Sequence, residues 1–216
     1  MRTDLKYPWE STERVREVAD NQVRRAGFNP EEFAWIGDAT PPDHDSSQGI
    51  GAALHYRLPT FGQSVEMLWE QLVGIYKNGS RSRYLLSDSA HLWDLRDPIH
   101  RLWRPLTREW VSINPAARLG ESVEWTRADS KPHLLGGIET LALAAQHPDL
   151  LRQRLSFSLP AVVCVLDDGR SLQQTLCLSY LGEGEGEDRE ELVVLEGCPI
   201  QRANKVWSCP MRVPPR

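Results

Sequence analysis

The stretch AVVCVLDDGRSLQQTLCLSY, residues 161–180, decides the fold class that the sequence predicts. Two segments rich in valine, leucine and cysteine flank Asp167-Asp168-Gly169-Arg170, and Asp-Gly suits a tight turn between two strands. We therefore expect a β-hairpin in which residues 161–166 pair with residues 171–180. Because side chains alternate along a strand, one face of this hairpin is expected to be drier. The residues on that face are Val163, Val165, Leu172 and Leu176.

Further strand candidates lie on both sides of this hairpin. Downstream, residues 192–195 and 205–207 are rich in valine, and they follow the acidic, glycine-rich loop 182–191. Upstream, short apolar segments bounded by glycine or proline are also candidates. These upstream segments are 33–36, 50–58, 110–113 and 122–126.

Helices are expected before the strand-rich part. Apolar residues at spacings of three and four predict amphipathic helices over 10–26 and 64–77. An almost wholly apolar helix at about 134–146 is expected in the core, followed by a shorter helix over 149–155. The predicted fold class is therefore α+β, an antiparallel meander packed against several amphipathic helices. We expect one globular domain, 1–216, that is helix-rich over 1–155 and strand-rich over 156–216.

Composition limits the classes of function. A chain of 216 residues with net charge −5 and pI near 5.7 offers no overall attraction to phosphate backbones, which argues against nucleic acid. Residues 1–17 carry scattered charge and no apolar core of a secretory signal, and the aliphatic runs are too short for a membrane span. We therefore expect a soluble, bacterial-type cytoplasmic protein with no membrane contact.

The cysteines are confined to the last quarter of the sequence. None of them forms the CxxC or CxxxC pair that a zinc ribbon or a redox motif requires. In a cytoplasmic protein we expect reduced, partly buried thiols, no metal site and no cofactor. The four residues are Cys164, Cys177, Cys198 and Cys209.

Residues 91–110, HLWDLRDPIHRLWRPLTREW, combine three tryptophans with four arginines. On a helical wheel the leucines share one arc, three arginines lie roughly opposite it, and Trp93 lies away from it. Because prolines 98 and 105 interrupt the segment, we expect one or two helical turns and then an extended segment through 110–113. One interpretation is a core segment with a basic edge. The other is a ligand-binding surface of Trp93, Arg101, Arg104 and Arg108.

A second cluster of polar residues suggests catalysis instead. An imidazole between two carboxylates can perform acid–base chemistry if outside groups converge on it. Sequence neighbours seldom converge on one point, so a polar turn is the alternative interpretation. The candidate catalytic residues are Asp38, Asp43, His44, Asp45 and His55.

Common catalytic and nucleotide-binding motifs are absent from the sequence, including GxxxxGK[ST], GxGxxG, HExxH and GxSxG. The leading prediction is therefore a non-enzymatic binding protein with a protein partner. A small hydrolase with its site at 38–55 is the alternative, and a nucleic-acid binder is the second alternative. The identity of the partner and the oligomeric state stay open.

Overall fold

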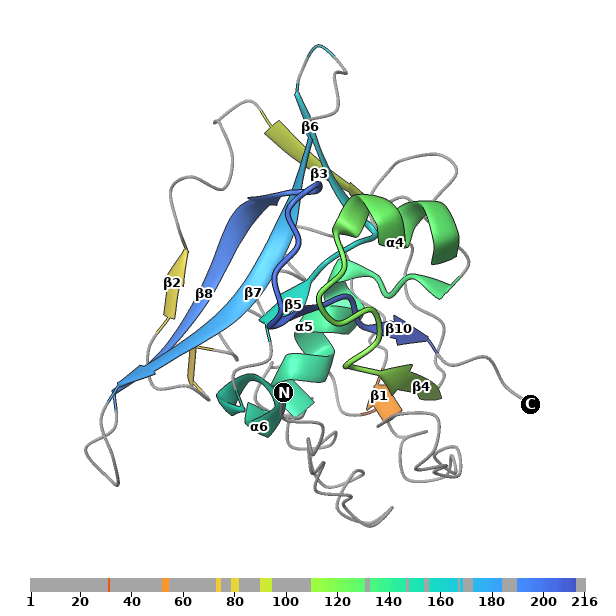
Figure 1. The fold of residues 1–216 in the computed structure, drawn as a ribbon. Coiled ribbons are helices and arrows are strands. Elements are labelled where there is room, and N and C mark those ends of the chain that lie inside the picture. Colours follow the sequence, from red (N-terminus) through yellow and green to blue (C-terminus); the bar gives the residue numbers. More distant parts are fainter. Residues whose placement is uncertain are drawn as a thin grey trace.

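A mixed β-sheet, two smaller sheets and a few short helices make up the described part of the chain, which is therefore α+β (Figure 1). The computed structural model describes residues 31, 52–54, 73–74, 79–81, 90–94, 110–130, 133–146, 148–153, 156–166, 168, 173–183 and 190–212. The upstream elements are β1 (Ala52–Leu54), β2 (Gly79–Arg81), β3 (Ala90–Asp94), β4 (Trp110–Asn114) and α4 (Val123–Ser130). The remaining elements are α5 (Gly137–Gln146), α6 (Pro148–Arg152), β5 (Ser156–Ser158), β6 (Val162–Leu166), β7 (Gln174–Glu183), β8 (Glu190–Pro199), β9 (Trp207–Ser208) and β10 (Met211–Arg212).

The main sheet has the strand order β2-β8-β7-β5-β9 among the described strands, and the two smaller sheets are β1-β4-β10 and β3-β6. The long strands β7 and β8 form an antiparallel hairpin from Gln174↔Pro199 to Glu183↔Glu190, and β5 adds to β7 antiparallel. However, β2 runs parallel to β8, and β9 runs parallel to β5. The expected antiparallel meander is thus corrected to a mixed sheet, because strands distant in sequence fill its edges.

The predicted hairpin between residues 161–166 and 171–180 is wrong. One edge of β7 pairs with β8 and the other with β5, where Phe157 lies opposite Leu178. Because both edges of β7 are occupied, β6 pairs with β3 instead, and Leu92 lies opposite Cys164. Of the proposed turn 167–170, only Asp168 is described, and it is an exposed turn residue.

The strands from that stretch are buried on both faces. Val162 and Cys164 are as buried as Val163 and Val165, and the same holds for all of residues 175–178. The expectation of one drier face is therefore wrong. A strand that is covered on both sides has a continuous apolar sequence, and VVCV fits this pattern better than an alternating one.

The apolar helix predicted at 134–146 is confirmed as α5, with its first turn displaced. The carboxylate of buried Glu139 accepts a hydrogen bond from the N–H of Gly136 (2.7 Å), and the Thr140 hydroxyl donates to the Gly136 carbonyl (2.8 Å). These bonds fix the start of the helix at Gly137. Leu141 and Leu143 are fully buried, so the predicted place in the core is also confirmed. The shorter helix is confirmed as α6, which begins at Pro148 and ends at Arg152 rather than 155.

Residues 122–126 form part of a helix, not the expected strand. The Ser122 hydroxyl accepts a hydrogen bond from the N–H of Trp125 (3.2 Å), which is the contact of a helix N-cap, and α4 follows at once. The strands expected at 110–113 and 192–195 are confirmed by β4 and β8, and the one expected at 50–58 is confirmed for residues 52–54 as β1, whereas β9 begins only at Trp207.

Several predicted elements lie outside the described residues. They include the helix over 10–26, the strand at 33–36 and all of the helix over 64–77 except residues 73 and 74, which are helical. Among the helices in the described ranges, none is long and apolar enough to cross a membrane.

Candidate functional site

The sequence-predicted site residues fall almost entirely outside the part of the chain that the structure describes. This holds for the proposed hydrolase residues Asp38, Asp43, His44, Asp45 and His55, and for Arg101, Arg104 and Arg108. Only the backbone of Trp93 is described. It lies in β3 opposite Val163, so the helical interpretation is wrong for residues 92–94. The reason is non-local, because β6 supplies a pairing edge for this segment.

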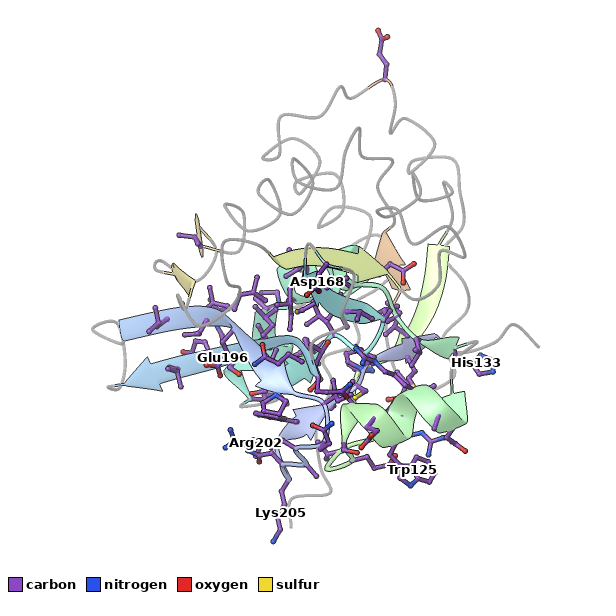
Figure 2. All side chains as sticks on the ribbon, turned by 90° about the horizontal axis from the view of Figure 1, so that it is seen from above. Trp125, His133, Asp168, Glu196, Arg202 and Lys205 are labelled. Atoms are coloured by element: carbon purple, nitrogen blue, oxygen red, sulfur yellow. The ribbon has the colours of Figure 1, made fainter. Side chains whose placement is uncertain are left out.

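A different group of aromatic and basic side chains lies on the surface near α4. The indole of Trp125 is 53% exposed, and Leu119 and Val206 are each 45% exposed. Arg202 and Lys205 are exposed beside Val206 in the sequence, and they project from the same side of the molecule as Trp125 (Figure 2). We call the set of Arg118, Leu119, Trp125, Arg202, Lys205 and Val206 the α4 surface.

Backbone hydrogen bonds hold the two segments of the α4 surface together. The N–H of Gly120 donates to the carbonyl of Trp207 (2.8 Å), and the N–H of Glu124 donates to the carbonyl of Ile200 (3.0 Å). A Cβ on Gly120 would lie 3.8 Å from the Cα of Lys205, which shows how closely the two chains approach. Leu119 and Val206 are therefore neighbours, although they are far apart in sequence.

The turn that precedes α4 holds Arg118 in an uncommon backbone conformation. Its φ of 53° is in the left-handed region, which costs a non-glycine residue on the order of 1 kcal/mol. Gly120, with φ of 83°, adopts positive φ without that cost. Among the described residues Arg118 is the one non-glycine residue with positive φ, and its guanidinium lies over the Trp125 ring.

Electrostatic contacts fix the guanidinium of Arg118. It lies 5.2 Å from the centre of the Trp125 ring, within the range of a cation–π interaction. It also forms ion pairs with Asp129 and, at 3.5 Å, with Glu121. These acidic partners, which lie at the edge of the α4 surface, offset the charge of Arg118.

A second tryptophan–arginine pair joins a buried indole to an exposed guanidinium. The guanidinium of Arg202 lies 5.1 Å from the centre of the Trp207 ring. Trp207 is only 7% exposed, and it forms a core cluster with Cys177 and Cys198. Trp207 is therefore a core residue, whereas its partner Arg202 belongs to the α4 surface.

All four cysteines are buried, more fully than expected from the sequence, and none of them forms a disulfide in the structure. Burial raises the pKa of Cys164 and of Cys209 to about 11. A hydrogen bond from the Cys198 thiol lowers the pKa of Cys177, and the same bond, together with burial, raises the pKa of Cys198.

Arg127 connects α4 to the strands beneath it. Its guanidinium donates to the carbonyl oxygens of Pro160 (2.7 Å) and Val162 (2.6 Å). Burial lowers the pKa of Arg127, and the nearby Cys164 sulfur partly opposes that shift. These bonds fix the helix that carries Trp125.

Sequence reasoning missed the α4 surface because residues 122–126 were expected to form a strand. A local signal was present, since Ser122 precedes a segment with Glu124 in its first turn, a common helix start. The contact between residues 115–125 and 200–209 has no local signal.

No family model, curated protein or solved structure matches this chain. Within the described residues, no group of three or more His, Cys, Asp or Glu side chains is placed to hold a metal ion.

Proposed function

We propose that this protein is a non-enzymatic binding protein of the cytoplasm, and that it contacts a protein partner through the α4 surface. One observation carries the proposal, the half-exposed indole of Trp125 on α4, over which the guanidinium of Arg118 lies next to the exposed Leu119 in the sequence. Tryptophan and arginine are the residues most enriched among those that dominate the energy of protein interfaces.

The arrangement of the exposed apolar residues supports this function. Single exposed hydrophobic residues are normal on a protein surface, whereas a group on one face is typical of interaction sites. Of the four exposed large hydrophobic residues among those described, three lie in the two hydrogen-bonded segments of the α4 surface. The fourth, Leu181, lies on β7.

The rigidity of the surface supports it further. The ring of Trp125 is held by Arg118, and α4 itself is fixed by the two hydrogen bonds of Arg127. A side chain that is already ordered loses less conformational entropy on binding. Glu121 and Asp129 neutralise part of the positive charge of Arg118, which weakens the attraction of that part of the surface to phosphate groups.

The aromatic-arginine surface predicted at 91–110, with Trp93, Arg101, Arg104 and Arg108, remains a second part of this proposal. We further propose that the amphipathic helices predicted over 10–26 and 64–77 complete the helical layer. Neither part is needed for the experiment on the α4 surface.

Site-specific photo-crosslinking in cells tests the proposal. A photoreactive amino acid at position 119 is compared with the same amino acid at position 181, where the natural leucine is 56% exposed. We expect a defined crosslinked protein from position 119 and not from position 181. The substitution Trp125→Ala should reduce that crosslink several-fold, because it removes the central contact.

Two results would contradict the proposal. The first is the same set of crosslinks from positions 119 and 181, which would indicate only non-specific contact of exposed leucines. The second is a crosslink from 119 that is unchanged by Trp125→Ala in a variant whose unfolding midpoint matches the wild type.

A further inference from the structure

We infer that Cys177 and Cys198 form a redox-active dithiol pair, which a small two-electron oxidant such as hydrogen peroxide converts to an intramolecular disulfide. The pair lies in the main sheet, with Cys177 on β7 and Cys198 on β8. This inference does not depend on the proposed partner binding.

The register of the sheet places the two side chains together. Cys177 lies opposite Glu196, and Thr175 lies opposite Cys198, so the cysteines are diagonal neighbours on one face. Both are buried, and they form one cluster with Trp207. Cys164 lies on β6, and Cys209 belongs to another core cluster, with Val123 and Ile200. Cys209 is nevertheless near enough to the pair to help raise the pKa of Cys198.

The surroundings divide the roles of the two thiols. The Cys177 thiol is hydrogen-bonded to the Cys198 thiol and to the hydroxyls of Ser179 and Ser158, and its Sγ lies 3.7 Å from the Ser179 Oγ. These bonds lower the pKa of Cys177 and favour its thiolate, which is the nucleophilic form. Cys198 keeps its proton, because burial and its bond to Cys177 raise its pKa.

The oxidation proceeds in two balanced steps. The Cys177 thiolate attacks one oxygen of hydrogen peroxide, the O–O bond breaks, and the sulfur becomes a sulfenic acid while the departing hydroxide is protonated to water. The Cys198 sulfur then loses its proton and attacks the sulfenic sulfur. The S–S bond forms, and the hydroxide that leaves takes up that proton as a second water. Two electrons pass from the two thiols to one peroxide.

Geometry predicts both the selectivity and the reversibility of this reaction. Cys177 is fully buried and Trp207 packs against it, so a small peroxide has better access than a bulky disulfide such as oxidised glutathione. Diagonal neighbours in a sheet have Cα atoms about 7–8 Å apart, whereas disulfides usually join Cα atoms about 4.4–6.8 Å apart. The strands must therefore shift to form the bond, which makes it easier to reduce than an unstrained disulfide.

Peptide mass spectrometry of the full chain tests the inference. The reduced, folded protein is treated with hydrogen peroxide, its remaining thiols are alkylated, and the digested peptides are analysed. We expect a loss of two hydrogen masses, a crosslinked peptide pair that contains Cys177 and Cys198, and alkylation of Cys164 and Cys209. Dithiothreitol should restore four alkylated thiols, and oxidised glutathione should give no crosslink in the folded chain.

Matched variants and an unfolded control complete the test. Cys164→Ala should keep the crosslink, whereas Cys177→Ala should abolish it and leave Cys198 available for alkylation. The wild-type measurement decides the matter even if a variant fails to fold. The inference is overturned if the folded chain keeps four alkylated thiols at a peroxide dose that oxidises the urea-unfolded chain. A disulfide that joins any other pair of cysteines overturns it as well.

Discussion

Two tryptophan–arginine pairs lie close together in this protein, and they have almost the same internal geometry. Arg118 lies 5.2 Å from the ring centre of Trp125, and Arg202 lies 5.1 Å from that of Trp207. Yet Trp125 is 53% exposed and Trp207 only 7%. The arginine contact therefore does not decide the role of either indole. The position of each ring decides its role. Trp125 lies on α4 at the surface, whereas Trp207 packs in a core cluster with Cys177 and Cys198.

The largest expected effect comes from removing the buried indole. Trp207→Ala should lower the free energy of unfolding by about 3–5 kcal/mol, because it leaves a cavity over Cys177 and Cys198. Urea denaturation followed by circular dichroism measures this loss. Trp207→Phe, which fills most of the space, should lose less than half as much. A loss below about 1 kcal/mol for Trp207→Ala would show that the two indoles contribute more similarly to stability than their burial indicates.

A third arginine sharpens the comparison, because Arg127 is half-buried and bonded to backbone rather than stacked on a ring. Arg127→Met should lower the free energy of unfolding by about 1–3 kcal/mol, since the Pro160 carbonyl loses its charged donor. The Val162 carbonyl also lies 2.9 Å from the Thr175 hydroxyl, but it shares that single proton with the closer Leu159 carbonyl (2.5 Å), so this contact offsets only part of the cost. Thermal and urea unfolding measure the change.

The control for Arg127 is a change that keeps the charge. Arg127→Lys keeps one donor and should recover part of the loss. Equal losses for the two variants would indicate that packing, not hydrogen bonding, fixes α4.

Two buried thiols, those of Cys164 and Cys209, make the stability of the core sensitive to alkaline pH. Burial raises the pKa of Cys164 and of Cys209 to about 11, from an ordinary value of 9.0. Between these values the unfolded chain loses its thiol protons while the folded chain keeps them, so stability falls as the pH rises. Near pH 10 the cost is about 1 kcal/mol for each thiol.

Unfolding free energies of the wild type and Cys164→Ala, compared near pH 7 and near pH 10, isolate this contribution. The variant should lose about 1 kcal/mol less than the wild type over that interval, whatever its packing cost at neutral pH. Parallel pH dependences for the two proteins would contradict a raised pKa at Cys164. Cys177 is a poor choice for this test. Its pKa is lowered in the folded state, so its contribution to the free energy of unfolding rises with pH instead of falling.

The sequence predicted the elements whose signals are local. The spacing and composition of 134–146 identified α5, Pro148 marked the start of α6, and the valine-rich segment 192–195 lies within β8. The errors occurred where pairing partners are distant. Asp-Gly suggested a hairpin after residue 166, but β5 and β8 occupy both edges of β7, and β6 pairs with β3.

The same distinction applies to the candidate site. The high density of tryptophans and arginines at 91–110 led to the prediction of a binding surface there. Trp125 and Arg118 are seven positions apart, and a turn with positive φ brings them together. The contact of Gly120 with Trp207 joins segments more than eighty residues apart, and no local pattern encodes it. The exposure of one tryptophan and the burial of the other therefore depend on tertiary structure.

The smallest effect on stability is expected from the exposed indole, and this result would complete the contrast with Trp207. Trp125→Ala should change the free energy of unfolding by less than about 1 kcal/mol, because it removes a solvent-exposed cation–π contact and little buried area. Arg118→Ala should cost no more, and Arg118→Gly should cost less than Arg118→Ala, since glycine accepts a φ of 53° without strain. Urea denaturation of the three variants under one set of conditions measures these differences. A loss for Trp125→Ala as large as that for Trp207→Ala would mean that the exposed indole stabilises the fold. Its exposure would then no longer support the proposal that the α4 surface is a binding site.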